Sequence, residues 1–299
     1  MIYLTKEDWI NLILSKLNNE ESFNQEFIEL YKIYNMIHFF CRKIYTTPNE
    51  QQTILVASQI ILHKYRICSN FSLNKYSSEE LYIIFGACIF IGQRAVNILK
   101  IKIDNISFFI KQIINKKNPT INVDIKDLNK KIFQKEYDIL TSIGFNIEID
   151  SPFLFFNKLK NYFLKTELNS ANFLTLLKYI IKDSFILPLS LYYTPNIITI
   201  SCVKILSEKY NLNSINIKEL ISLSEYQIYE EEIQQCAILI QRLEDAINEK
   251  KNQNNNSTKT NNNVVKGEKE KDGDINENTN STKASIITEV IPSIKMNIE

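Results

Sequence analysis

Two segments of this 299-residue chain share one pattern at a fixed distance. Residues 83–91 read IIFGACIFI and residues 197–205 read IITISCVKI, an offset of 114 residues. Each copy sets a small residue and a cysteine among large apolar residues, and a small residue inside a helix lets another helix approach closely. A helix that is apolar nearly all round is a buried one. The repeat therefore predicts two copies of one helical unit, each built around its own central helix.

The scarcity of turn-forming residues favours the same architecture. The chain has 5 glycines and 6 prolines, which is typical of long helices and counts against a protein of many short strands. Its hydrophobic fraction of 44% is enough for large cores. Gly86, Gly92 and Gly144 are the glycines outside the polar C-terminal segment, so no Gly-rich phosphate-binding loop can be built. We predict an all-α protein.

Cap residues and prolines divide the chain into helices. An N-terminal helix is expected at 9–17, and five main helices, a short linker and five more helices follow it. Gly144 is the expected C-terminal glycine of the fifth main helix, and Ser151-Pro152 is expected to open the next one. The main helices are predicted at 27–45, 49–65, 77–94, 104–114, 127–143, 151–164, 172–187, 194–210, 217–223 and 225–250.

Both ends of the chain carry further information. Residues 251–283 are dominated by Asn, Lys, Glu, Ser and Thr, so this segment cannot bury enough apolar surface to offset the entropy of ordering it. We predict that residues 251–299 form a disordered low-complexity tail with a small apolar island near its end. At the other end, charged residues precede any apolar run, so no signal peptide is expected. The longest apolar runs are too short to span a bilayer.

Charge and cysteine content exclude several classes of protein. A net charge of +1 gives no global field that favours nucleic acid or membranes. The 5 cysteines stand singly without any Cys-x-x-Cys motif, so no metal site is predicted, and buried thiols in a reducing compartment are expected. His38 and His63 have no paired ligand or nucleophile at a useful spacing. We therefore predict no catalytic residue and no cofactor.

Three segments together give the chain a resemblance to the cyclin family. Residues 52–65 followed by 81–94 are similar to the second and third helices of the first cyclin box. Residues 136–153, which include EYDIL, GFNI and SPF, resemble the end of the first box and the entry to the second. Residues 183–198, with LSLYYTPNII, look most like the transcriptional cyclins of the K, L, T, C and H types.

The resemblance implies an architecture and a function. It implies an N-terminal helical extension (1–23), two five-helix cyclin boxes (24–146 and 147–250) and the tail (251–299). It also implies a regulatory subunit that binds and activates a cyclin-dependent protein kinase. That role is expected in transcription by RNA polymerase II, and the expected location is the nucleus, with the cytoplasm as an alternative. Such a protein is not itself an enzyme, and we expect no membrane or direct nucleic-acid partner.

The resemblance also implies kinase-binding residues. Cyclins contact their kinase through a basic residue that ends the third helix and a glutamate in the fifth, and Arg94 and Glu136 stand at these positions. The family has Lys at the first position and often two acids after it, where this chain has Val96 and Asn97. Three further residues match apolar contact positions of the family: Leu140, Phe145 and Ile147.

Other interpretations remain open at this point. Without the resemblance, Arg94 and Glu136 would be interpreted as two unrelated surface charges, and Phe145 and Ile147 are equally consistent with residues that fill the junction between the boxes. For the whole chain, the main alternative is a DNA-binding general transcription factor of the TFIIB type, against which the absence of cysteine pairs and the near-zero net charge count. A helical scaffold without a kinase partner is a third alternative, although repeat solenoids have periods shorter than 114 residues.

Overall fold

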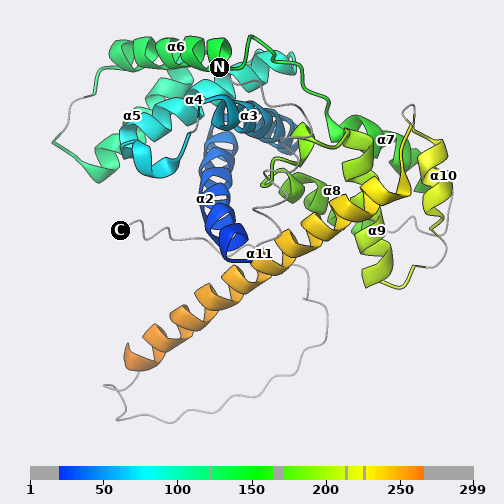
Figure 1. Cartoon of the computed structure of the whole chain (residues 1–299). Helices are drawn as coiled ribbons and strands as arrows, with labels where there is room; N and C mark the ends of the chain where they lie inside the picture. Colours follow the sequence, from blue (N-terminus) through cyan, green and yellow to red (C-terminus); the bar gives the residue numbers. More distant parts are fainter. Residues whose placement is uncertain are drawn as a thin grey trace, which may run out of the picture. The chain divides into compact units, whose positions relative to one another are not determined.

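The structure is a computed structural model that describes residues 20–69, 71–120, 123–163, 171–212, 215–224 and 227–265. Over these residues the chain is helical and contains no strand, which confirms the all-α prediction (Figure 1). The first helices are α2 (Glu20–Ile44), α3 (Pro48–Ser69), η1 (Leu73–Lys75), α4 (Ser78–Ala95), α5 (Ile103–Lys117) and α6 (Ile125–Ser142). The later ones are α7 (Pro152–Phe163), α8 (Ala171–Ser184), η2 (Leu189–Leu191), α9 (Pro195–Lys209), α10 (Ile217–Ser222) and α11 (Glu230–Val265).

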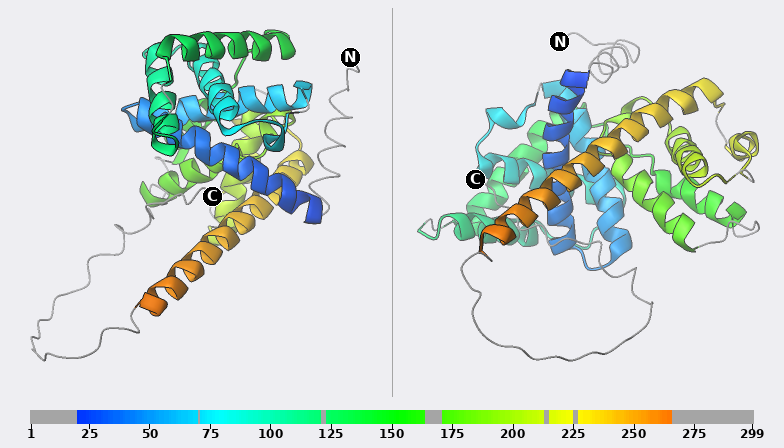
Figure 2. Two further views of the ribbon diagram at one scale, coloured as in Figure 1. Left: turned by 90° about the vertical axis from the view of Figure 1, so that its left-hand side faces the viewer. Right: turned by 90° about the horizontal axis from the view of Figure 1, so that it is seen from below.

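The helices up to α10 fall into two groups, each arranged around a central helix (Figures 1 and 2). In the first group, α2, α3, α5 and α6 all contact α4, and in the second, α7, α8 and α10 all contact α9. The central helices α4 and α9 carry the two repeated segments, and both segments are almost entirely buried. The sequence-based prediction of two buried central helices is therefore confirmed.

The repeat extends to the ends of the two central helices. Asn97 ends α4 in the left-handed conformation (φ 56°), and Asn211 ends α9 in the same way (φ 53°). Asn211 lies 114 residues after Asn97, the offset of the repeated segments. After each asparagine, the next amide donates a hydrogen bond across the last turn, from Ile98 to the Gln93 carbonyl and from Leu212 to the Ser207 carbonyl, both at 2.8 Å. Asparagine tolerates this conformation better than most residues, so it stops both helices.

The helix starts follow the capping signals in the sequence. The Ser77 hydroxyl accepts a hydrogen bond from the Glu80 amide, and the Glu80 carboxylate accepts one from the Ser77 amide, which completes a capping box for α4. Thr194 caps α9 through the Ile197 amide, and Pro195 occupies its first turn. These capping contacts satisfy backbone amide groups that have no partner within the helix.

Two glycines allow neighbouring helices to pack closely against α4. A Cβ atom on Gly92 would lie 2.9 Å from the Ser58 hydroxyl and 3.0 Å from the Ser58 backbone nitrogen, both on α3. A Cβ atom on Gly86 would lie 3.0 Å from the ends of the Ile106 and Ile110 side chains on α5. Gly86 lies inside the repeated segment and does what the sequence predicts, whereas the closer contact, with α3, is made at Gly92, just after that segment.

Several boundaries differ from the sequence-based prediction, among them the start of α2 at Glu20 instead of 27 and the end of α3 at Ser69 instead of 65. Helix α5 continues to Lys117, and α11 continues to Val265 where the sequence predicts an end at Lys250. No glycine or proline occurs between 251 and 266, and none of the asparagines in that segment ends the helix before Val265. By its contacts the chain nevertheless divides into the units 1–250 and 251–299. The predicted helix at 9–17 and the rest of the predicted tail, from 266 on, lie outside the described residues.

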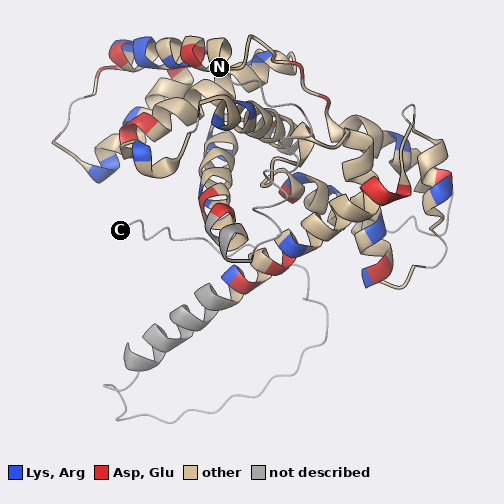
Figure 3. Ribbon diagram, viewed as in Figure 1, with Lys and Arg blue, Asp and Glu red and all other residues tan. Residues whose placement is uncertain are grey.

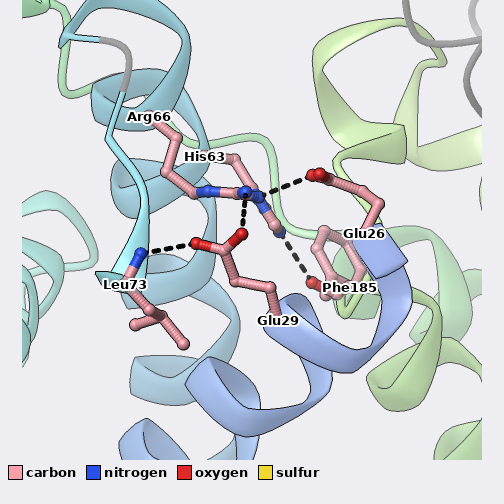
Figure 4. Close-up of polar contacts among 6 residues, drawn as sticks. All are labelled: Glu26, Glu29, His63, Arg66, Leu73 and Phe185. Atoms are coloured by element: carbon pink, nitrogen blue, oxygen red, sulfur yellow. Dashed lines mark hydrogen bonds and ion pairs between the residues drawn. The ribbon is translucent and has the colours of Figure 1, made fainter. Parts of the chain in front are cut away.

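Hydrogen bonds join the two helical groups. The Tyr34 hydroxyl of α2 donates to the Asp183 carboxylate of α8 at 2.7 Å. His63 Nε2 of α3 donates to the Phe185 carbonyl, just after α8, at 3.0 Å (Figure 4). Burial lowers the pKa of His63 from 6.5 to about 3, so the imidazole is neutral at physiological pH. The side chains of Tyr34 and His63 are therefore paired across this interface.

One turn further along α3, Arg66 fixes the position of α2 (Figure 4). Its guanidinium pairs with the carboxylate of Glu26 at 3.0 Å and with that of Glu29 at 3.8 Å. Glu29 also accepts a hydrogen bond from the Leu73 amide at 2.6 Å. Because the Arg66 side chain is only 12% exposed, these contacts are shielded from solvent and hold α2, α3 and η1 together.

Candidate functional site

One exposed face of α6 carries aromatic and charged residues. Phe133, Glu136, Tyr137 and Leu140 follow the spacing i, i+3, i+4, i+7, which places them on one side of the helix. The Phe133 and Tyr137 residues are 46% and 60% exposed, although Leu128, Ile132 and Ile139 of the same helix are buried. Lysines and acidic residues occupy other parts of α6, so charges of both signs lie along the helix (Figure 3). The helix therefore buries one apolar stripe and presents a second to solvent.

Arg94, at the end of α4, meets this face. Its guanidinium forms a hydrogen-bonded ion pair with the Glu136 carboxylate. The guanidinium carbon also lies 4.1 Å from the centre of the Phe90 ring, a cation–π contact. Phe90 in turn packs edge-to-face against Phe133, with ring centres 5.9 Å apart. We call Phe90, Arg94, Phe133, Glu136 and Tyr137 the α4–α6 surface.

The two members of the ion pair have different environments. The Arg94 side chain is 45% exposed and the Glu136 side chain only 7%. Burial raises the pKa of the Glu136 carboxyl above its usual value, and the Arg94 guanidinium offsets this only in part. Within the free protein, the pair is therefore a partly exposed cation held by a buried acid. The exposed edge of the guanidinium can bind a further acceptor.

Phe145 lies at the C-terminal end of α6 in a conformation that bulky residues rarely adopt. Gly144 is left-handed (φ 62°), as the sequence predicts for a C-terminal glycine, and Phe145 is left-handed as well (φ 57°). The Phe145 amide donates to the Leu140 carbonyl at 2.7 Å and the Gly144 amide to the Thr141 carbonyl at 3.2 Å, which is a Schellman motif. Phe145 is nevertheless 61% exposed, so its ring gains little from packing within this chain.

The linker after Phe145 is held by a lysine of α3. Lys64 Nζ donates to the Asn146 carbonyl at 3.1 Å, to the Asn146 side-chain oxygen at 3.0 Å and to the Glu148 carbonyl at 3.0 Å. Burial lowers the pKa of Lys64. Between these two anchored residues, Ile147 is partly buried against the apolar core. The linker that presents Phe145 is thus fixed to the first helical group.

The five residues that the resemblance places at a kinase contact differ in their pairing and in their exposure to solvent. Arg94 and Glu136 are brought together as the resemblance implied, although 42 residues separate them. Leu140 and Ile147 are partly buried against the core, while Phe145 is exposed. Asn97, in place of a family acid, is the left-handed residue that ends α4. The left-handed end of α4 therefore explains why an asparagine stands at position 97.

Sequence reasoning missed Phe90, Phe133 and Tyr137. The spacing of Phe133 and Tyr137 beside Glu136 and Leu140 was available as a signal, because i, i+3, i+4, i+7 defines a helix face. The contribution of Phe90 was hidden, since it lies in a helix that is apolar on all sides and only the packing of α6 selects its contacts.

No cluster of His, Cys, Asp and Glu suited to hold a metal ion occurs among the described residues. Within the same part of the chain, no helix combines the length and apolar character needed to cross a membrane. Comparison of the sequence with models of known protein families gives no match, and comparison with curated proteins gives none either.

Proposed function

We propose that this protein is a cyclin, a regulatory subunit that binds and activates a cyclin-dependent protein kinase in transcription. Phe145 is the observation that carries the proposal. A large aromatic side chain is held in a strained left-handed conformation and left exposed next to the helix that carries Glu136. Strain of this kind persists where a function requires it, and a partner that buries the ring supplies one. Two groups of helices around the repeated α4 and α9 agree with two cyclin boxes.

The α4–α6 surface fits a helical partner with acceptor groups. Exposed Phe133 and Tyr137 supply apolar area, exposed Phe145 adds to it at the C-terminal end of α6, and the half-exposed Arg94 supplies hydrogen-bond donors. In cyclins, which this chain resembles, such a surface packs on the regulatory helix of the kinase. The helix then holds its glutamate against the lysine that positions the ATP phosphates, an ion pair that catalysis requires. A cyclin achieves this by binding the active conformation more tightly and shifting the population towards it.

Reconstitution of kinase activity tests the proposal. The purified chain is mixed with candidate cyclin-dependent kinases, and phosphate transfer to a polymerase-derived peptide is measured. We expect no transfer by the chain alone and strong stimulation of one kinase. A matched variant, Tyr137→Ala, removes exposed aromatic surface without disturbing the core and should lower the stimulation. Lys116→Ala, on the end of α5, serves as the control.

The alternative of a TFIIB-type protein predicts a different result. Tight binding to duplex DNA that weakens steeply with salt, together with no stimulation of any kinase, would overturn the proposal in favour of that alternative.

A further inference from the structure

Four basic side chains lie on α2, α7 and α8, helices other than those of the α4–α6 surface. We call Arg42, Lys160, Lys178 and Lys182 the basic cluster. Lys178 and Lys182 are one turn apart on α8, so they lie on the same side of that helix. Lys160 is in the last turn of α7, which packs on α8, and Arg42 is in the last turn of α2. The hydrogen bond from Tyr34 to Asp183 fixes α2 beside α8.

The electrostatic environments of His38 and Lys178 agree with this placement. His38 of α2 has its pKa lowered to about 4, mainly by burial and further by the nearby charges of Lys182 and Arg42. Burial also lowers the pKa of Lys178, and the charge of Lys160 adds to the effect. Lys178 Nζ donates to the Asn49 side chain at 3.0 Å, a neutral acceptor that leaves its charge uncompensated.

The cluster has one neighbouring carboxylate for its four cations. Asp183 accepts the Tyr34 hydroxyl at 2.7 Å and pairs with Lys182 Nζ at 3.3 Å through the same oxygen. Among the described residues, Arg42, Lys160 and Lys178 have no carboxylate within ion-pair distance. Among the described residues, the four cations thus face the single carboxylate of Asp183, which leaves most of their charge uncompensated.

Helix dipoles account for only part of this arrangement. Arg42 and Lys160 lie in the last turns of their helices, where a cation is favourable. Lys178 lies in the middle of α8, is half-buried and has a second lysine close by, so it loses from burial and from repulsion alike. An anion bound between the helices would reverse both costs.

We infer that the basic cluster binds the phosphate group of a phosphoserine or phosphothreonine peptide from a protein partner. A phosphate monoester carries about −1.5 to −2 charges at pH 7 and several strong acceptor oxygens, which match a guanidinium and three ammonium groups. The exposed ring of Tyr179, which lies 4.9 Å from Lys182 Nζ, offers an adjacent apolar contact for a peptide side chain. A nucleic acid fits less well, because the cluster is compact and the net charge of the chain is only +1.

Peptide binding to the full-length chain tests this inference. A fluorescent pool of degenerate phosphoserine peptides and its unphosphorylated counterpart are titrated with the protein, and polarisation is measured. We expect the phosphorylated pool to bind at least about tenfold more tightly, as charge-assisted hydrogen bonds to phosphate require. Inorganic phosphate should compete. Lys178→Ala and Lys160→Glu, the latter at an exposed position, should each remove most of the difference in affinity between the two peptide pools. Lys116→Ala should retain that difference.

Three results would overturn the inference. The first is equal affinity for the two peptide pools. The second is wild-type affinity in Lys160→Glu, which remains decisive even if Lys178→Ala does not fold, because Lys160 is exposed. The third is tighter binding of a single-stranded oligonucleotide or of anionic lipid vesicles than of the phosphopeptide pool. None of these outcomes depends on kinase activation, so this inference and the proposed function fail separately.

Discussion

At position 145 the free protein holds a phenylalanine in the left-handed region of backbone conformation. Its amide completes the C-terminal hydrogen bonds of α6, which fixes the backbone, while the ring stays largely in solvent. A left-handed residue with a Cβ atom costs roughly 1–2 kcal/mol, and an exposed ring regains little of that. The same position in a chain selected for stability alone would suit glycine, which has no such cost.

Replacing Phe145 with glycine should therefore stabilise the free protein and weaken partner binding. We expect Phe145→Gly to raise the free energy of unfolding by up to about 1 kcal/mol, since part of the gain is offset by greater flexibility of the unfolded chain. Phe145→Ala is the matched control, because alanine retains the left-handed strain and should give no gain. Urea unfolding measures all three proteins. A loss of stability in the glycine variant would show that the ring packs within the chain.

Glu136 makes a second prediction at the residue scale, in the pH dependence of stability. Its pKa in the folded protein is raised above the usual 4.5, so the folded state binds the proton more tightly than the unfolded state. This contribution to stability is complete below pH 4.5 and is lost as pH rises through the raised value. Relative to Glu136→Gln, the wild type should become less stable from pH 4.5 upward. Urea unfolding of both proteins between pH 4 and 7 tests this, and an opposite slope of the difference would contradict the environment described for Glu136.

At the scale of elements, the sequence predicted much of the fold because local signals set it. Ser77, Thr194 and Gly144 cap or end helices through contacts within a few residues, so their roles could be predicted from sequence. The C-terminal end of α11 could not be predicted from sequence, because no glycine or proline between 251 and 266 marks where the helix stops. The pairing of Arg94 with Glu136 depends on how α4 packs on α6, and only the cyclin resemblance led to it.

Helix packing at the two glycines of α4 gives a matched pair of predictions. Gly92→Ala places a methyl group 3.0 Å from the backbone nitrogen of Ser58, so α3 must shift, and we expect a loss of about 1–3 kcal/mol. Gly86→Ala meets side-chain methyl groups of Ile106 and Ile110 and no backbone atom, and alanine is the better helix former by about 1 kcal/mol, so its net change should be smaller than that of Gly92→Ala. Thermal unfolding of both variants measures the difference. Equal losses would contradict the close contact of α3 with α4.

For the molecule as a whole, the interface between the two helical groups should respond to acid. His63 donates to the Phe185 carbonyl across this interface as a neutral imidazole. Its pKa falls from 6.5 to about 3 on folding, so its contribution is complete above pH 6.5 and is lost as pH falls towards 3. His38, with a pKa of about 4, acts in the same direction.

We therefore expect the free energy of unfolding to fall between pH 6.5 and 4, and to fall less in His63→Gln, whose amide retains a donor for Phe185. Denaturant titrations at several pH values measure this difference. A variant with the same pH slope as the wild type would contradict the assignment of a buried neutral histidine to this interface.

The most direct test of the account is to identify what binds the α4–α6 surface and the exposed Phe145 at the end of α6. Full-length tagged protein and the double variant Tyr137→Ala/Phe145→Gly are purified from native cells in parallel, and the co-purified proteins are quantified by mass spectrometry. Both substitutions lie at exposed positions, so the variant should fold, which circular dichroism checks. We predict that a cyclin-dependent kinase co-purifies with the wild type in comparable amount and is reduced at least about tenfold with the variant, equivalent to about 1.4 kcal/mol. Recovery of no protein kinase, or of equal amounts with both proteins, would contradict the account.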